Sequence, residues 1–305
     1  MKPLVSICCT SYNQENYIAQ AIEGFLSQKT SFPLEIIIHD DASTDRTVEI
    51  IKAYAKKDLR ITTVFQSENQ YSKNIKIWPN YLFPRARGKY IALCEGDDYW
   101  TDPLKLQKQV DFLESHPDYV IAWTNYQVYN GKLFLKNNFN HTEQNTTIDF
   151  NNLFSQYCTY TLTSVFRRDA IDIPLLKTLK YFKDNSLYVA LLKQGKGVFM
   201  DFESAVYRIH EGGVYSLQSD FIQNYSSYLN LLEVTNAIPE SKTVNIKKVI
   251  KSLGDASAFE VLRLKKMGEE LSQNQLDFMN SYFKKVGLMT KFKYYKRLFK
   301  FKFLK

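Results

Sequence analysis

The chain has 305 residues, which exceeds one typical domain but scarcely fills two, so we expect one large α/β domain with a smaller helical appendage. Of its residues 45% are hydrophobic and 15% aromatic, which argues against intrinsic disorder. No apolar run is long enough to span a bilayer, and the N-terminus lacks the apolar length and the cleavage site of a signal peptide. We therefore expect a cytoplasmic protein whose four cysteines are reduced thiols.

The net charge of +8 is concentrated at the C-terminus. Residues 284–305 contain nine basic residues and no acidic one, so subtracting nine from +8 leaves −1 for the rest. The main body therefore offers no support for a nucleic-acid-binding face, and we expect no nucleic acid partner. In the tail, basic residues alternate with aromatic ones, which suits a segment lying on an anionic membrane surface; a solvated tail or a partner-binding helix is the alternative.

In the first half, short β-rich runs alternate with helical patterns, the order expected of a parallel sheet covered by crossover helices. The predicted strands are residues 4–9, 34–39, 61–66 and 90–94. Apolar spacing predicts helices around residues 18–26, with Asn13 as a plausible N-cap, and around 48–54. Residues 67–84 lack a clear pattern and are expected to form a loop with a short helix.

The second half begins with a predicted helix over residues 103–115, with Pro103 in its first turn, where a missing N–H costs nothing. The pair Asn130-Gly131 then predicts a hairpin between residues 119–129 and 132–135. Farther along, the pattern predicts a helix over 188–192, a strand over 197–207 and helices from about 221 onward.

Polar clusters follow three of the predicted strands. They are residues 10–13 (Thr-Ser-Tyr-Asn), 40–43 (Asp-Asp-Ala-Ser) and 96–98 (Gly-Asp-Asp). In an open α/β sheet, ligands bind beyond the carboxyl ends of the strands, so the coincidence of three clusters at one edge predicts a ligand site there.

The adjacent carboxylates of Asp97 and Asp98 repel each other unless a cation or a set of donors offsets their charge, which indicates a divalent metal site. Oxygen ligands favour Mg²⁺ or Mn²⁺, which also take ligands from substrate phosphates. A solvated turn is the alternative for such a pair. The buried strand before the pair and Tyr99-Trp100 after it favour the metal site.

Three further candidates each have a structural and a functional interpretation. Asp41 either caps the following helix or accepts a bond from a nucleotide base, with Tyr12 as an aromatic face for the ring. Asp184 is either the N-cap of the next helix or a general base. His210, in the Gly-rich segment 207–213, is either an ordinary histidine or a group that ligates the metal or donates to a phosphate.

With these residues in view, the chain resembles glycosyltransferase family 2, the inverting enzymes of GT-A fold. Residues 5–13, 35–47 and 87–98 look like the three N-terminal motifs of that family, in order. The resemblance is close over about residues 1–130. It implies a Rossmann-like, mixed, mainly parallel α/β sheet flanked by helices, with a C-terminal helical extension.

The division of the chain that follows from this resemblance has two parts. Residues 1–220 form the catalytic domain, in which 1–130 bind the nucleotide-sugar and 131–220 face the acceptor. Residues 221–305 form the helical extension with its basic aromatic tail.

The resemblance also implies roles for single residues. Thr10, Tyr12 and Asp41 would hold the base, commonly uracil. Asp98 would be the direct metal ligand, with Asp97 facing the ribose or sugar. Asp184 becomes the preferred general base, and His210 a second candidate metal ligand.

Two segments depart from the family pattern. No glycine follows Asn69, where the family usually has one, so contacts of the donor loop are not carried over. Lys183 stands where an acidic residue or a glycine usually precedes the base.

The implied reaction moves a sugar from a nucleoside-diphosphate donor, with a UDP-sugar expected, to a hydroxyl of a glycan or lipid-linked acceptor, with inversion and with Mn²⁺ or Mg²⁺ as cofactor. The implied setting is bacterial surface polysaccharide or lipopolysaccharide assembly, with peripheral contact at the inner face of the membrane through 284–305. A non-catalytic relative that binds nucleotide or glycan is an alternative. A sugar nucleotidyltransferase is another, but it would have a Gly-rich basic loop where residues 10–13 lie.

Overall fold

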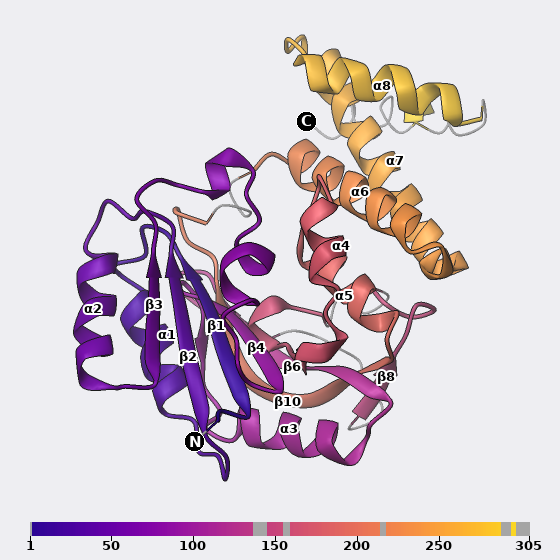
Figure 1. The fold of residues 1–305 in the computed structure, drawn as a ribbon. Coiled ribbons are helices and arrows are strands. Elements are labelled where there is room, and N and C mark those ends of the chain that lie inside the picture. The colour runs from indigo at the N-terminus through magenta and orange to yellow at the C-terminus, as the bar shows by residue number, and fades with distance from the viewer. Residues whose placement is uncertain (1, 137–144, 155–158, 214–217, 288–293, 297–305) are drawn as a thin grey trace.

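The computed structural model describes residues 2–136, 145–154, 159–213, 218–287 and 294–296 (Figure 1). They form a sheet flanked by helices, with three long helices of the C-terminal region stacked at one side of it (Figure 1). Among the described residues, no helix combines the length and the apolar character needed to cross a bilayer.

The sheet has ten strands in the order β3-β2-β1-β4-β9-β6-β10-β5, with β7 beside β6 and β8 beside β10. Pairs among β1 to β4 are parallel, as is β6 with β10, whereas β9 runs antiparallel between β4 and β6. The predicted mixed, mainly parallel α/β sheet is therefore confirmed. The strands are β1 Val5–Ser11, β2 Leu34–Asp40, β3 Ile61–Phe65, β4 Tyr90–Glu95, β5 Tyr99–Trp100, β6 Tyr119–Tyr129, β7 Phe134–Lys136, β8 Asn145–Ile148, β9 Val165–Arg167 and β10 Lys196–Arg208.

The helices cover both faces of this sheet (Figure 1). They are α1 Ile18–Leu26, α2 Thr47–Lys57, α3 Lys105–Ser115, α4 Ile173–Thr178, α5 Asp184–Leu192, α6 Asp220–Ala237, α7 Val244–Met267 and α8 Gln273–Lys285. The short turns are η1 Tyr71–Lys73, η2 Trp78–Leu82, η3 Thr161–Thr163, η4 Arg168–Ala170 and η5 Pro239–Ser241.

The alternation of side chains along each strand divides the buried residues between two cores. Cys9 packs with α1, α2 and α3 on one face of the sheet, while its neighbour Cys8 packs with η2, α5 and α6 on the other. Both thiols are buried and unpaired, as is that of Cys94, in agreement with the expectation of reduced cysteines; Cys158 lies outside the described residues.

The predicted element boundaries differ from the structure at three helix starts. Helix α1 begins after Tyr17, and the predicted N-cap role of Asn13 is wrong, because its side chain accepts the N–H of Thr44 instead. Helix α3 begins at Lys105, so Pro103 precedes the helix instead of lying in its first turn. Helix α5 begins at residue 184, four residues before its predicted start.

The C-terminal helices are anchored to the sheet domain at one end. Leu231 and Val234 of α6 and Ile246 of α7 belong to the same core as α5. The first half of α6 joins α7 and α8 in a separate small core around Phe278 and Tyr282. Helix α6 begins next to the predicted boundary at 220, but its second half packs into the core of the sheet domain.

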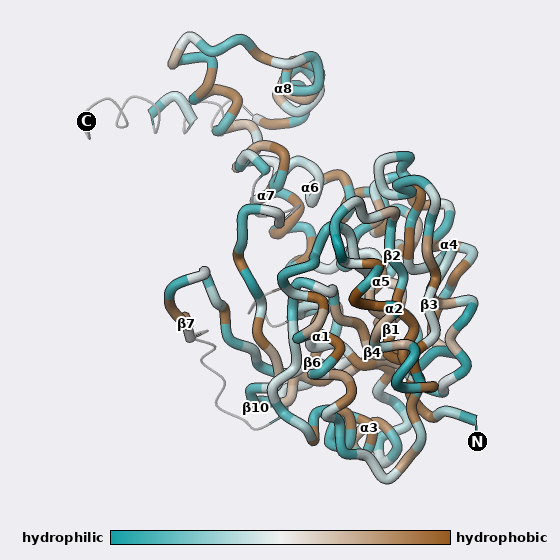
Figure 2. The backbone as a smooth tube through the Cα atoms, turned by 90° about the vertical axis from the view of Figure 1, so that its left-hand side faces the viewer, coloured by the Kyte–Doolittle hydropathy of each residue, from teal (hydrophilic) through white to brown (hydrophobic). Residues whose placement is uncertain are grey.

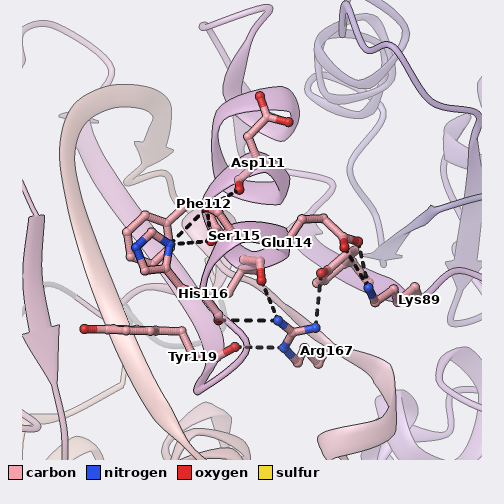
Figure 3. Close-up of polar contacts among 10 residues, drawn as sticks. Lys89, Asp111, Phe112, Glu114, Ser115, His116, Tyr119 and Arg167 are labelled. Atoms are coloured by element: carbon pink, nitrogen blue, oxygen red, sulfur yellow. Dashed lines mark hydrogen bonds and ion pairs between the residues drawn. The ribbon is translucent and has the colours of Figure 1, made fainter.

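The end of α3 is fastened to the sheet by one arginine of β9. The guanidinium of Arg167 donates to the backbone carbonyls of Leu113 at 2.5 Å and Tyr119 at 2.8 Å, and beside it Lys89 pairs with Glu114 at 2.8 Å (Figure 3). The last carbonyls of a helix have no partner within it, so this arginine satisfies groups that would otherwise be orphaned.

Replacing Arg167 by Met should lower the free energy of unfolding by about 2 to 3 kcal/mol, since charge-assisted hydrogen bonds to several carbonyls are lost together. Urea denaturation followed by circular dichroism measures this difference. Arg85→Met is the matched control, because Arg85 is exposed and donates to a single carbonyl, that of Tyr81. Equal losses in the two variants would show that Arg167 does not anchor α3.

Candidate active site

The three polar clusters predicted from the sequence come together at one edge of the sheet. Thr10 of β1 lies opposite His39 of β2 on one side and Glu95 of β4 on the other. The loops that follow are bonded to the same strand, since Gly96 donates its N–H to the carbonyl of Thr10 and Asp41 to that of Ser11, each at 2.9 Å.

Asp41 and Tyr12 lie at this edge in different environments. The ring of Tyr12 is 42% exposed, as an aromatic face for a planar ligand would be. The carboxylate of Asp41 is buried, and its two oxygens accept the backbone N–H groups of Gln70 at 2.8 Å and Tyr71 at 2.9 Å. Asp41 therefore holds the η1 turn against the end of β2.

Asp40, the neighbour of Asp41, accepts the hydrogen bonds of the turn after β2, the capping role that the sequence analysis considered for Asp41. Its carboxylate accepts the N–H and the hydroxyl of Ser43 and the hydroxyl of Ser11. Asn13 adds a second link, because its backbone N–H donates to the hydroxyl of Ser43 at 2.8 Å. The loops after β1 and β2 thus form one bonded unit.

Asp98 is nearly buried, at 2% exposure, and one carboxylate oxygen accepts the backbone N–H of Arg208 at 2.9 Å. The guanidinium of Arg208 donates to the carbonyl of Asp97 at 2.5 Å and lies 4.2 Å from the ring centroid of Tyr99 and 5.3 Å from that of Tyr17. The end of β10 is therefore fastened to the acidic loop after β4.

Asp97 faces His210. The Nε2 atom of His210 lies 3.1 Å from a carboxylate oxygen of Asp97, while Nδ1 accepts the N–H of Gly212 at 3.2 Å. Since Nδ1 is an acceptor, Nε2 carries the proton and donates to Asp97. The ring of Tyr17 packs on the imidazole, with centroids 4.4 Å apart.

The spacing of Asp97 and His210 fits a pair of ligands for one cation. Their facing atoms are 3.1 Å apart, and a small divalent ion takes ligands at about 2.1 Å, so the spacing allows one ion to contact both. Such an ion needs the proton to move from Nε2 to Nδ1, which breaks the hydrogen bond from Gly212. Among the described residues, no group of three or more His, Cys, Asp or Glu side chains is arranged to hold a metal ion. Such an incomplete set suits Mg²⁺ or Mn²⁺, which complete their coordination with water and substrate phosphates.

Burial and mutual repulsion perturb the carboxylates of this edge. Burial, followed by the charges of Asp97 and Asp184, raises the pKa of Glu95 to about 8. Burial, followed by the charges of Asp97 and Glu95, raises the pKa of Asp98 well above its ordinary value. Burial also raises the pKa of Asp184. The negative charge of Asp184 therefore acts on the carboxyl of Glu95 at the end of β4.

Asp184 is the first residue of α5, and the alternative interpretation of it as the N-cap is wrong, because Lys183 occupies that position. The segment before it is held by α6, where the carboxylate of Glu233 accepts the N–H groups of Lys180 at 2.8 Å and Tyr181 at 2.7 Å. The ammonium of Lys183 donates to Ser226 of α6 at 2.7 Å. The helical extension therefore fixes the position of Asp184.

Sequence reasoning did not assign roles to three residues that the site uses. Arg208 lies in the Gly-rich segment, yet nothing in the sequence indicates that it bonds to a loop 110 positions earlier. Glu95 lies beside Asp97 in the sequence, but its closeness to Asp184 depends on the packing of α5. Glu233 lies within a helix. The sequence pattern of a helix does not distinguish a glutamate that accepts two distant N–H groups from a glutamate on the solvent-exposed surface.

In metal-free buffer with EDTA, the protein should lose stability as the pH rises from about 5 to about 8. A carboxyl whose folded pKa is raised stabilises the fold fully below its ordinary pKa, and this contribution is lost as the pH passes the folded value, here about 8 for Glu95. Melting temperatures measured across this range give the slope.

Asp97→Asn should flatten this slope, because one repelling charge is removed, and Mn²⁺ should restore stability to the wild type at the upper end. Asp201→Asn, at an exposed position of β10, is the control and should keep the wild-type slope. A wild-type slope in Asp97→Asn would contradict the electrostatic coupling.

Relatives among the curated proteins match between about two fifths and two thirds of this chain. An uncharacterized protein of Mycobacterium tuberculosis is 50% identical over 121 residues, which are 39% of this chain and 34% of that protein, so the chain matches about a third of that relative's length. TuaG of Bacillus subtilis, provisionally named as a teichuronic acid biosynthesis glycosyltransferase, is 31% identical over 64% of this chain and 74% of its own. WfaP of Escherichia coli, named as a UDP-Glc:alpha-D-GlcNAc-diphosphoundecaprenol beta-1,3-glucosyltransferase, is 38% identical over 41% and 47%.

Solved structures share the fold over most of the chain. Residues 1–349 of TarS from Staphylococcus aureus, in complex with UDP-GlcNAc, superpose with a TM-score of 0.62 at 17% identity, covering 92% of this chain and 79% of that one. The mannosyltransferase PcManGT from Pyrobaculum calidifontis, with GDP-Man and Mn²⁺, gives 0.54 at 13% identity over 92% and 85%. The expected GT-A fold is confirmed. The sequence model described as Glycosyl transferase family 2 matches residues 6–173, more than half of the chain, and the protein therefore belongs to that family.

Proposed function

We propose that this glycosyltransferase moves a sugar from a UDP-sugar to a hydroxyl of a glycan or lipid-linked acceptor, with inversion at the anomeric carbon. The observation that carries the proposal is that the loops after β1, β2 and β4 meet at one edge of the sheet, where Asp97 faces His210. The charge of Asp184 acts there too, since it and Asp97 both raise the pKa of Glu95. A metal-binding carboxylate and a general base in one site are the two groups that such a displacement needs. WfaP is named for a UDP-sugar donor, and TarS binds UDP-GlcNAc.

The nucleotide would lie over the ends of β1 and β2. Thr10 borders this edge, and the exposed ring of Tyr12 offers a stacking face for the base. Asp41 would act on the base from a buried position, because its oxygens already hold the η1 turn and a carboxylate oxygen can accept more than one bond.

The metal would bind at Asp97 and His210, whose donor atoms face each other. This assignment differs from the sequence-based one, in which Asp98 was the direct ligand and Asp97 faced the ribose or sugar. Asp98 is nearly buried and fastened to the N–H of Arg208, so its main contribution is to hold the loop that presents Asp97. A bound Mn²⁺ or Mg²⁺ would offset negative charge on the departing diphosphate.

Asp184 would take the proton from the acceptor hydroxyl as that oxygen attacks the anomeric carbon and the nucleoside diphosphate leaves on the opposite face. Its raised pKa makes it a stronger base than an exposed carboxylate once it is ionised. Lys183, which departs from the family pattern, is turned to α6 through Ser226 and supports the helix start.

The acceptor would be part of a surface polysaccharide assembled at the inner face of the membrane, the class of product for which TuaG and WfaP are named. The basic aromatic tail, residues 284–305, would contribute contact with anionic lipid. Most of this tail lies outside the described residues; Lys284 and Lys285 form the basic last turn of α8.

Asp184→Asn should lower the transfer rate about 10² to 10⁴-fold, because the base is lost, and should leave nucleotide binding unchanged. UDP release from a panel of UDP-sugars, with and without acceptor glycans, measures transfer. Asp169→Asn, at an exposed position of η4, is the matched control and should be fully active. Unimpaired transfer by Asp184→Asn would remove Asp184 from the mechanism.

UDP together with Mn²⁺ should raise the melting temperature of the wild type, since ligand at a hundredfold excess over its dissociation constant contributes about 2.7 kcal/mol. Asp97→Ala and His210→Ala should lose the Mn²⁺-dependent part of this shift. Asp98→Ala should lower the melting temperature of the free protein and keep a Mn²⁺-dependent shift. If Asp98→Ala instead loses that shift while Asp97→Ala retains it, Asp98 is the ligand. No shift with UDP, GDP, dTDP or ADP would favour the non-catalytic relative.

A further inference from the structure

The hairpin formed by β6 and β7 presents three consecutive large apolar side chains to solvent. Leu133, Phe134 and Leu135 are 64%, 55% and 45% exposed. Successive side chains of an extended chain point to opposite faces, so both faces of this tip are apolar and open. Single exposed apolar residues are ordinary on protein surfaces, but a contiguous set at a projecting point marks an interaction site.

The tip is rigid. The side-chain oxygen of Asn130 accepts the backbone N–H groups of Lys132 at 3.1 Å and Leu133 at 2.9 Å, and Gly131 supplies the positive φ of 85° that the turn requires. The ring of Phe134 packs against that of Tyr129, its cross-strand partner, with centroids 4.8 Å apart. The apolar side chains are therefore held outward by the turn.

The hairpin leaves the sheet at the end where the candidate active site lies. Tyr129 at the end of β6 lies opposite Arg208 of β10, and its carbonyl accepts the N–H of Ile209 at 2.8 Å. The next residue along the chain is His210. The loop that carries β7 projects from the body of the molecule (Figure 2).

The charge of this region favours an anionic partner. The hairpin from Tyr129 to Lys136 contains Lys132 and Lys136 and no acidic residue. Lys132, directly before the apolar tip, is exposed. Basic residues beside an apolar tip are the composition of a segment that enters the interface of an anionic bilayer.

We propose that the hairpin tip, Leu133–Leu135, inserts into the interfacial region of an anionic lipid bilayer, with Lys132 at the level of the headgroups. A bilayer surrounds an inserted tip and covers both of its faces, whereas a flat protein surface would cover one. This anchor is distinct from the basic tail. Its consequence for catalysis, the presentation of the active site to a membrane-bound acceptor, rests on the proposed function.

Sedimentation with vesicles tests the proposal on the full-length protein. Wild type should sediment with vesicles of phosphatidylglycerol and phosphatidylethanolamine, and a variant combining Leu133→Ser, Phe134→Ser and Leu135→Ser should bind about tenfold or more weakly. Lys132→Glu should weaken binding to these vesicles but not to phosphatidylcholine vesicles. Because the side chains are exposed, the melting temperatures of all variants should stay at the wild-type value.

Leu59→Ser is the matched control. Leu59 is 98% exposed and precedes β3, at the edge of the sheet opposite the active site. This variant should bind vesicles as wild type does.

Two outcomes would overturn the proposal. The first is no sedimentation of wild type with anionic vesicles, and the second is unchanged sedimentation of the triple variant. If the second outcome comes with a change from dimer to monomer in light scattering, the tip is instead a contact between two copies. The melting shift caused by UDP separates this test from the proposed function. The triple variant should keep the wild-type shift, because the tip does not bind the nucleotide. If the wild type itself shows no shift with UDP, the proposed function fails and the membrane anchor is unaffected.

Discussion

The crowding of carboxylates at the end of β4 is the constraint around which the rest of the structure is arranged. Glu95, Asp97 and Asp98 follow a buried strand within four positions, and burial raises the pKa values of Glu95 and Asp98. Such a loop is unstable by itself, because like charges in a low-dielectric environment repel. Arg208 offsets this cost through its backbone N–H and its guanidinium, which is itself held between two tyrosine rings. The charge repulsion that remains would favour a cation at this loop, as in the proposed function.

The second half of the sheet places the side chains of Arg208 and His210 next to that loop. Strand β10 pairs with β6 in parallel and with the short β5 in antiparallel fashion, with Val206 opposite Tyr99. This pairing carries Arg208 and His210 to the acidic loop. Helix α6 performs the corresponding task for α5, since Glu233 and Asn230 hold the carbonyl and N–H groups of the segment that leads into Asp184. The helical extension is therefore part of the site's construction as well as an addition to it.

Much of the nucleotide half could be predicted from local patterns. Four buried parallel strands, the helices between them and the hairpin at Asn130-Gly131 follow from apolar periodicity and turn chemistry, which depend on neighbouring residues only. The helix caps depend on distant residues instead. Asn13 has the chemistry of an N-cap, but its side-chain oxygen accepts the N–H and the hydroxyl of Thr44, which lies 31 positions away. Asp184 has the chemistry of a cap too, but it is the first residue of α5, and Lys183 is the N-cap.

By itself, the sequence determined the class of fold, the edge of the sheet where we expect ligands and the acidic residues that lie there, because strand order and polar clusters at strand ends follow from local spacing. Only the tertiary structure decided the environment of each of these acidic residues. Asp98 is drawn into the interior by a strand 110 positions later, Asp97 is left facing His210, and Asp184 is brought beside Glu95 by a helix from the extension. The physical reason is that burial and charge at a residue depend on everything packed around it, and most of that packing comes from residues distant in the chain.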